Sequence, residues 1–210
     1  MSRIILIGGP PRSGKTTLAQ EVSKKLGIPW ISTDAFDDVA KKYVPDVDQD
    51  RFFPKTALRL KSGGGNDEMY STFSAEDIVS AYWKQAETVH AAVESFIQCA
   101  NNEGWNYIIE GYHITPKFIA ELQAENLNVS SVILISSAGE PAIERSMKST
   151  TKKDWLRDKT RQPETFQKVA NMISLFSERL VREAGGHGVK IIDMNGDFQA
   201  KFEEAARYIS

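Results

Sequence analysis

The sequence predicts a three-layer α/β fold, in which a five-stranded parallel sheet is covered by helices on both faces. Two observations lead to this prediction. Short apolar runs alternate with longer amphipathic stretches along the 210 residues, and the first apolar run passes directly into a glycine-rich turn. Strands that are separated by helices form parallel sheets, because each connection crosses one face of the sheet before the next strand begins.

Five apolar runs are the expected strands, and three amphipathic stretches are the longest expected helices. The strands are residues 4–7, 29–32, 107–110, 129–136 and 189–193, and the helices are residues 15–26, 75–102 and 163–184. The last helix shows the pattern best, because its apolar side chains recur at spacings of three and four residues. They are Phe166, Val169, Ala170, Ile173, Phe176, Leu180 and Ala184.

Two segments interrupt this alternation. Residues 45–74 contain Pro45, Pro54 and the run Ser-Gly-Gly-Gly-Asn at 62–66, which predicts an irregular excursion after the second strand. Residues 139–161 follow the fourth strand and are rich in lysine and arginine. Both segments start at the carboxyl edge of the sheet, where ligands bind in such folds. We therefore expect a single domain over residues 1–210, with an excursion at 45–74 and a basic lid at 139–161.

The composition excludes several classes of protein. With 41% hydrophobic and 26% charged residues, the chain has the composition of a globular protein. The net charge of -2 gives no broad basic stripe, so nucleic acid is not an expected partner. No apolar run approaches the roughly 20 residues of a membrane-spanning helix, so no membrane contact is expected. The single cysteine, Cys99, forms no internal disulfide, which favours a cytoplasmic location. Nothing in the sequence indicates an oligomeric state.

The glycine-rich turn matches the pattern G-x-x-x-x-G-K-[ST] at residues 9–16. Such a turn presents backbone N–H groups to phosphate, and the helix that follows directs the positive end of its dipole at the same anion. Lys15 is expected to reach the terminal phosphates and the Thr16 hydroxyl to ligand Mg²⁺. The predicted nucleotide-binding residues are Gly9, Arg12, Ser13, Gly14, Lys15, Thr16 and Thr17.

Two acidic residues follow strands beside this loop. Asp34 closes the second strand, where a carboxylate accepts or orients the proton of an attacking hydroxyl; the alternative is an N-cap of a helix at 35–43. Asp37 and Asp38 are interpreted as solvated acids of that helix. Glu110 ends the third strand, where it either holds Mg²⁺ or aligns an acceptor, or is merely an exposed strand-end acid.

A histidine and several basic residues are further candidates for contact with the substrate or the transferring phosphoryl group. His113 either contacts a substrate anion or is a structural hydrogen-bonded group. The segment from Arg145 to Arg161 has seven basic and two acidic residues, and is either a solvated face or a lid that brings cations to a transferring phosphoryl group. Arg145 is the first choice for that cation, followed by Lys152, Lys153 and Arg157, and the excursion adds Arg51 and Arg59 as substrate-binding candidates, with Lys55 and Lys61 as further basic residues.

With these motifs assembled, the chain resembles the small P-loop kinases of the nucleoside-monophosphate-kinase-like superfamily. Within it, the stretches ISTDAFDDVAKKY at 31–43 and IIEGYHITP at 108–116 resemble 2-phosphoglycerate kinase-like proteins. The resemblance implies a P-loop NTPase fold, ATP and Mg²⁺ as cofactors, and transfer of the γ-phosphoryl group of ATP to a small, anionic metabolite. It also implies that Gly9, Gly14, Lys15 and Thr16 grip ATP, that Asp34 serves the acceptor side, that Glu110 is the acid at the strand end, and that lid cations lie near Arg145.

Two other functions stay open. A nucleoside monophosphate kinase would find an aromatic slot for its base among Phe52, Phe53 and Tyr70. A regulatory ATPase or nucleotide switch would use the same phosphate loop with water as acceptor. A kinase of nucleic-acid ends is a minor alternative, because the lid cations suit a phosphate backbone.

Overall fold

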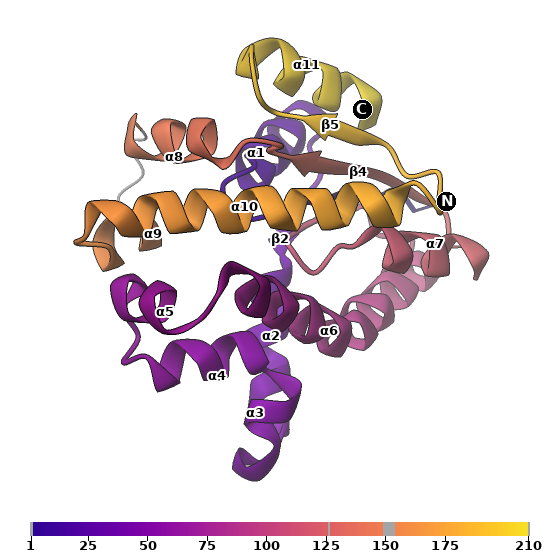
Figure 1. Cartoon of the computed structure of the whole chain (residues 1–210). Helices are drawn as coiled ribbons and strands as arrows, with labels where there is room; N and C mark the ends of the chain where they lie inside the picture. The colour runs from indigo at the N-terminus through magenta and orange to yellow at the C-terminus, as the bar shows by residue number, and fades with distance from the viewer. Residues whose placement is uncertain (1, 126, 149–153, 210) are drawn as a thin grey trace.

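The computed structural model describes residues 2–125, 127–148 and 154–209, and its centre is a parallel sheet (Figure 1). The strands are β1 (Ile4–Gly8), β2 (Trp30–Ser32), β3 (Tyr107–Glu110), β4 (Val129–Ile135) and β5 (Ile191–Asp193). They lie in the order β2-β3-β1-β4-β5, and every pairing is parallel. The predicted fold class is confirmed, and the strand ends agree with the sequence to within two residues.

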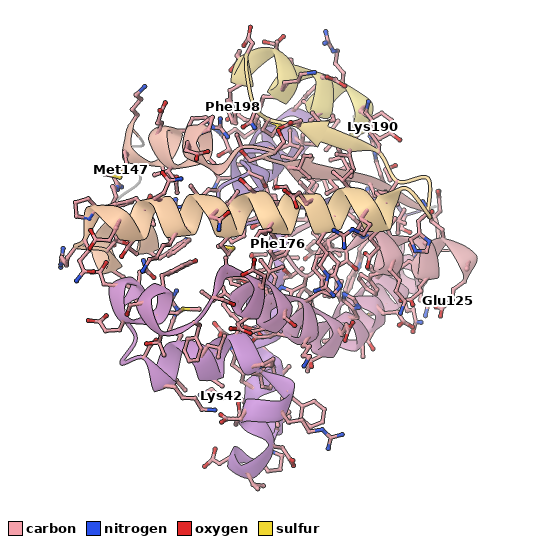
Figure 2. The ribbon with its side chains drawn as sticks, viewed as in Figure 1. Lys42, Glu125, Met147, Phe176, Lys190 and Phe198 are labelled. Carbon is pink, nitrogen blue, oxygen red and sulfur yellow. The ribbon has the colours of Figure 1, made fainter. Side chains whose placement is uncertain are left out.

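The sheet separates two apolar cores because successive strand residues point to opposite faces. Ile4 and Leu6 of β1 pack in one core and Ile5 and Ile7 in the other. The first core is covered by α6 (Ala75–Glu103), α7 (Pro116–Ala124) and α10 (Pro163–Ala184), and the second by α1 (Lys15–Leu26) and α11 (Phe198–Ile209). Figure 2 shows Phe176 of α10 on the side of the helix that faces α6, where its ring lies 5.4 Å from that of Trp83.

The excursion at 45–74 is helical, so the prediction of an irregular segment is wrong. After α2 (Thr33–Tyr43) come a 3₁₀ turn (Asp46–Asp48), α3 (Gln49–Phe52), α4 (Pro54–Lys61) and α5 (Asn66–Thr72). Pro54 starts α4 at a position where the backbone N–H has no helical partner, so it favours the helix instead of breaking it. Phe53, Met69 and Tyr70 are buried, and this tertiary burial stabilises helices that are too short to form alone.

The segment after β4 forms α8 (Gly139–Lys148) and, beyond residues 149–153, α9 (Trp155–Lys159). Its second part is tied to α5. The Asn66 amide donates to the Trp155 carbonyl (3.1 Å) and to Thr160 Oγ1 (2.9 Å). The Asp67 carboxylate accepts from the backbone N–H groups of Arg161 (2.8 Å) and Gln162 (3.2 Å). The excursion and the second part of the segment at 139–161 are therefore joined by four hydrogen bonds that are buried or partly buried.

A search of the described residues finds no helix with the length and apolar character needed to cross a membrane.

The strand register fixes where polar side chains gather. Ile7 of β1 and Ser32 of β2 are both paired with Glu110 of β3, so these three strands end at the same level. The phosphate loop follows β1, and α2 follows β2. Loop, α2 and Glu110 therefore share one edge of the sheet, as expected for ligand sites in parallel α/β folds.

Candidate active site

A cavity of about 860 Å³ lies at this edge, between the phosphate loop and the helices that follow β2 and β4. The phosphate loop and α1 contribute Arg12, Gly14, Lys15, Thr16 and Thr17, and the ends of β2 and β3 contribute Ser32, Asp34 and Glu110. Cationic side chains dominate the lining, since seven lysines and arginines face only two acidic residues. Such a lining attracts anions and strengthens their binding where water is partly excluded.

The phosphate loop needs glycine where the sequence motif has it. The backbone at Gly9 has a φ of +139°, and a Cβ there would lie 2.0 Å from the Leu134 carbonyl oxygen. Gly14, at +93°, is the N-cap of α1, and a Cβ there would lie 3.2 Å from the Phe198 ring. A larger residue at either position would displace the loop from the strand or helix that supports it.

Lys15 lies inside the loop, buried, with its Nζ donating to the Pro10 carbonyl (2.6 Å). Burial lowers its pKa, while the nearby carboxylates of Glu110 and Asp34 act in the opposite direction. An ammonium in this position is poised for the terminal phosphates of a nucleotide, whose charge would compensate its desolvation. Ser13 is completely buried in the same loop.

Arg12 is held by the lid. Its guanidinium forms an ion pair with the buried Asp154 and lies over the Trp155 ring, 5.2 Å from the centroid. Its backbone has a φ of +69°, which is uncommon for a residue with a side chain and is maintained here by these contacts. Arg12 lines the cavity, and it also connects the phosphate loop to α9, which the motif gave no reason to expect.

Thr16 and Glu110 form a pair of oxygen ligands suitable for Mg²⁺. The Thr16 hydroxyl donates to Glu110 Oε1 (3.1 Å), and Glu110 is only 3% exposed. Burial raises the pKa of Glu110, opposed by Lys15 and by hydrogen bonds from Thr16 and Ser32. Within the described ranges, no group of three or more His, Cys, Asp or Glu side chains is arranged so that it could hold a metal ion by itself. A Mg²⁺ ion here would accordingly share its coordination with phosphate oxygens and water, as this ion usually does.

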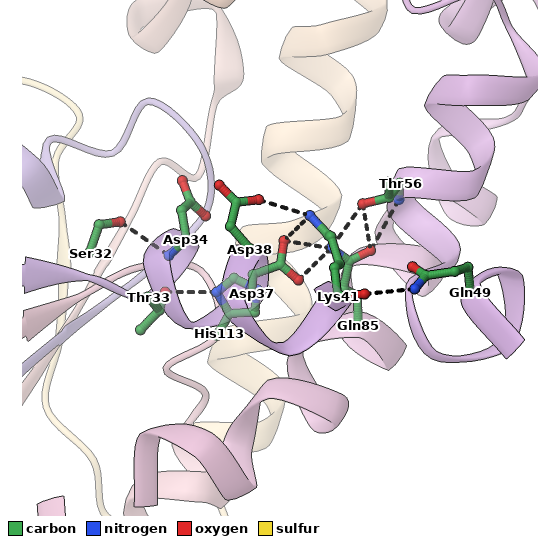
Figure 3. A network of polar contacts seen from close by, with 10 residues as sticks. All are labelled: Ser32, Thr33, Asp34, Asp37, Asp38, Lys41, Gln49, Thr56, Gln85 and His113. Carbon is green, nitrogen blue, oxygen red and sulfur yellow. Dashed lines mark hydrogen bonds and ion pairs between the residues drawn. The ribbon is translucent and has the colours of Figure 1, made fainter. Parts of the chain in front are cut away.

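Asp34 is not the cap of the following helix. That helix begins at Thr33, and Ser32 is its N-cap, whose Oγ accepts from the Asp34 N–H (3.3 Å; Figure 3). Because Ser32 caps the first turn of α2, the Asp34 carboxylate is not needed as a cap. It lines the cavity and stands apart from the polar network around Asp37. The interpretation of Asp34 as a cap of a helix starting at residue 35 is thus wrong.

Asp37, interpreted as a solvated acid, is instead only 3% exposed. Its carboxylate accepts from Gln85 Nε2 (2.9 and 3.0 Å) and pairs with Lys41 (2.6 Å; Figure 3). This network joins α2 to α6 and so fixes the helix that carries Asp34. Asp38 has an 80% exposed side chain, which confirms its interpretation as a solvated acid.

Of the histidine and lid candidates, Arg145 lines the cavity, whereas His113 and Arg157 do not. His113 is completely buried behind the cavity, hydrogen-bonded through Nδ1 to Thr33 Oγ1 (2.7 Å), and burial lowers its pKa well below the usual value. Arg145 lines the cavity and lies 4.9 Å over the Phe198 ring, next to Gly14. Arg157 has its Nε 3.7 Å from Asp154 Oδ2 and is not part of the lining. Lys152 and Lys153 lie outside the described residues.

Of the two substrate-binding candidates in the excursion, one lines the cavity and the other does not. Arg59 lines the cavity, whereas Arg51 is exposed over the Phe52 ring and is not part of the lining. The cavity is also lined by Lys55, which the sequence offered as a further basic residue of the excursion, and by Tyr82, Trp155 and Phe198, which it did not indicate. Lys55 had one usable signal, because it precedes Arg59 by four residues and so shares its helix face. The aromatic residues come from three separate helices and had none.

Comparisons with known proteins show the family and the fold of the chain. A family model described as an AAA domain matches residues 5–165. Among curated proteins, the chain is 36% identical over 117 residues to a 2-phosphoglycerate kinase from Pyrococcus furiosus, covering 55% of this chain and 37% of that protein. It is 29% identical over 196 residues to a 2-phosphoglycerate kinase from Methanothermobacter thermautotrophicus, covering 90% and 60% respectively. The chain thus spans between about a third and three fifths of these relatives.

Among solved structures, the chain is similar to shikimate kinase from Bacteroides thetaiotaomicron, with a TM-score of 0.52 and 13% identity over 98% of this chain and 97% of that one. This likeness concerns the fold alone. The family match covers β1 through the start of α10, which includes the phosphate loop, Asp34, Glu110 and the described lid residues. The chain belongs to the family of P-loop nucleotide-binding domains that the AAA-domain model represents.

Proposed function

We propose that the chain is an ATP-dependent kinase that transfers the γ-phosphoryl group of ATP to a hydroxyl group of a small anionic metabolite, in the manner of a 2-phosphoglycerate kinase. The proposal takes residues 1–210 as one catalytic domain. Its main support is the placement of Asp34, which lines the same cavity as the phosphate loop and the Thr16–Glu110 pair. The names of the curated relatives support the choice of acceptor.

In this proposal each residue has a separate task. The loop N–H groups and Lys15 bind the phosphates, and Thr16 with Glu110 would hold Mg²⁺, which neutralises charge on the transferring group. Asp34 accepts the proton of the acceptor hydroxyl while the hydroxyl oxygen forms the new bond to the γ-phosphorus. The bond from phosphorus to the oxygen bridging to ADP breaks, and ADP leaves. Arg145 and the lid cations offset the negative charge that develops during transfer.

The cationic lining favours an anionic acceptor over a neutral sugar. The base slot that a nucleoside monophosphate kinase was expected to build from Phe52, Phe53 and Tyr70 is not supported, because Phe53 and Tyr70 are buried and none of the three lines the cavity. A regulatory ATPase would not require the basic residues that α4 adds beside Asp34.

The test is consumption of ATP with Mg²⁺, measured alone and with phosphorylated hydroxy acids, nucleoside monophosphates and sugar acids. A many-fold stimulation by 2-phosphoglycerate, with a doubly phosphorylated product detected by mass spectrometry, is expected. Stimulation by a nucleoside monophosphate alone would favour the alternative kinase class. Slow hydrolysis that no compound changes would contradict phosphoryl transfer to these acceptors and favour an ATPase.

A further inference from the structure

Helix α4 presents two basic residues to the cavity, Lys55 and Arg59, which are one helical turn apart. Residues at this spacing lie on the same helix face. The two remaining basic positions of the excursion behave differently. Lys61, on the same helix, is exposed and pairs with Asp50 (2.7 Å), and Arg51 lies over Phe52 on the surface. Only two of the four cations therefore face a ligand site.

Lys55 is not in direct contact with any carboxylate in the described part of the chain. Within those ranges its Nζ has no hydrogen bond or ion pair, and it lies over two neighbouring rings, 5.4 Å from the centroid of Tyr82 and 5.2 Å from that of Tyr112. Aromatic faces attract an ammonium group but accept no strong hydrogen bonds from it. The pKa of Lys55 is lowered by burial, which Asp34 and Asp37 partly oppose. A partly desolvated cation with unused N–H donors gains free energy when an anion binds it.

Arg59 is oriented by contacts that leave donors unused. One terminal nitrogen donates to the Gly64 carbonyl (3.2 Å) and to Asn66 Oδ1 (3.1 Å), and the guanidinium lies 5.8 Å over Trp155. Within the described residues, its other nitrogens have no hydrogen-bond partner. Asn66 in turn donates to Trp155 and Thr160, so Arg59 is held by the junction of excursion and lid. The guanidinium is therefore preorganised, which lowers the entropic cost of binding an anion.

We propose that Lys55 and Arg59 form the subsite for a phosphate monoester group of the acceptor, and that Lys55 makes the enzyme select a phosphorylated hydroxy compound over its unphosphorylated counterpart. This inference rests on the proposed function and extends it to named recognition residues. Two cations suit a dianionic phosphate, whereas one would suffice for a carboxylate. Asp34 lines the same cavity, and its negative charge repels a phosphate group. The reacting hydroxyl thus lies toward Asp34 and the phosphate ester toward α4.

The experiment compares 2-phosphoglycerate with glycerate in the wild type, in Lys55→Gln and in the matched control Lys61→Gln. Removing Lys55 is expected to lower kcat/KM for 2-phosphoglycerate roughly 10- to 100-fold, the usual effect of losing a hydrogen bond between charged groups. The same substitution should change kcat/KM for glycerate less than about threefold and leave the KM for ATP unaltered. Lys61→Gln should have the kinetic constants of the wild type. A loss of equal size for both acceptors would overturn the assignment, since a structural role of Lys55 predicts that result.

Calorimetric titration of 2-phosphoglycerate in the presence of Mg²⁺ and ADP tests the subsite without turnover. The subsite is supported if the wild type and Lys61→Gln bind 2-phosphoglycerate and Lys55→Gln binds it at least tenfold more weakly. This support holds even if no acceptor in the kinetic panel is phosphorylated. Equal affinity of the wild type and Lys55→Gln, or no binding by the wild type, would overturn it. The failure of the kinase proposal and the failure of this inference are thereby told apart.

Discussion

At the scale of single residues, the function of the site depends on where α2 begins. Ser32 caps the helix through its hydroxyl, and Asp34, two residues later, is released from that task. Asp37, one turn further along, is fixed by Gln85 and Lys41 and anchors the helix. Three polar residues within one turn and a half thus have three different physical roles: capping, facing the cavity and anchoring.

Replacing Asp34 with Asn should lower kcat about 100-fold or more, the range typical for loss of a general base. The dissociation constant for ATP should change little, because nucleotide binding depends on the phosphate loop. Steady-state kinetics together with calorimetric titration of ATP provide the two values. Asp38→Asn is the matched control, since Asp38 is exposed on the same helix. Equal losses in turnover and in ATP affinity would mean that Asp34 acts on nucleotide binding.

Glu110→Gln should raise the Mg²⁺ concentration that nucleotide binding requires. The amide keeps the hydrogen bond with Thr16 but removes the negative charge that favours a divalent cation. Calorimetric titrations of ATP at several Mg²⁺ concentrations should show at least a tenfold higher requirement, with metal-free binding unchanged. If the Mg²⁺ requirement of the variant equals that of the wild type, Glu110 is not part of the metal site.

At the scale of elements, the phosphate loop, the lid and the excursion are joined at Trp155. Arg12 of the loop and Arg59 of α4 both lie over its ring, and Asp154 beside it pairs with Arg12 and caps α9. Asn66 and Asp67 hold the ends of the same segment to α5. The nucleotide side and the acceptor side of the cavity thus share one structural junction.

Removal of the Arg12–Asp154 ion pair should destabilise the protein far more than removal of the exposed Lys61–Asp50 pair. Loss of one partner of a buried pair costs about 3 to 5 kcal/mol, whereas an exposed pair contributes about 0 to 1 kcal/mol. We therefore expect Asp154→Ala to lower the free energy of unfolding in urea strongly and Asp50→Ala hardly at all. A double-mutant cycle with Arg12→Ala should give a coupling energy well above that of the exposed pair. Similar values for both pairs would contradict a structural junction at α9.

At the scale of the whole molecule, the sheet with its two cores places the site and also buries ionisable groups that must stay neutral. His90 stacks on Phe118 at 4.1 Å and donates through Nε2 to the His113 carbonyl (2.8 Å). Burial lowers the pKa of His90 to about 4, and the pKa of His113 is also well below its usual value. Both imidazoles are therefore neutral in the folded protein at neutral pH.

The buried histidines predict a loss of stability in mild acid. Between pH 6.5 and about 4 the unfolded chain binds a proton at His90 that the folded protein does not, so the free energy of unfolding falls as the pH falls through this range. The contribution of His90 is at most about 3 kcal/mol. Thermal unfolding from pH 7.5 to 4.5 should show a falling Tm, and His90→Gln should flatten this dependence. An identical pH profile for the wild type and the variant would contradict a neutral, buried His90.

Much of the architecture could be predicted because it depends on local patterns. Residues 15–26 and 163–184 form helices with the predicted bounds, since their apolar spacing and the glycine or proline at their ends act within one element. The phosphate loop was recognisable for the same reason, because its backbone geometry requires glycine at fixed positions. The helices of the excursion were not recognisable from the sequence, because these short helices depend on burial of Phe53, Met69 and Tyr70 against distant parts of the chain.

The sequence by itself determined the parallel α/β class, the phosphate loop and the presence of acids at the ends of β2 and β3. Only the tertiary structure decided that Lys55 and Arg59 face the cavity while Lys61 and Arg51 face solvent, and that Arg12 is paired with Asp154 of the lid. The physical reason is the range of the interactions. Glycine conformation and helix periodicity act between neighbours in the chain, whereas burial, ion pairing and the lining of a cavity depend on residues that are far apart, such as Arg12 and Asp154, which are 142 positions apart.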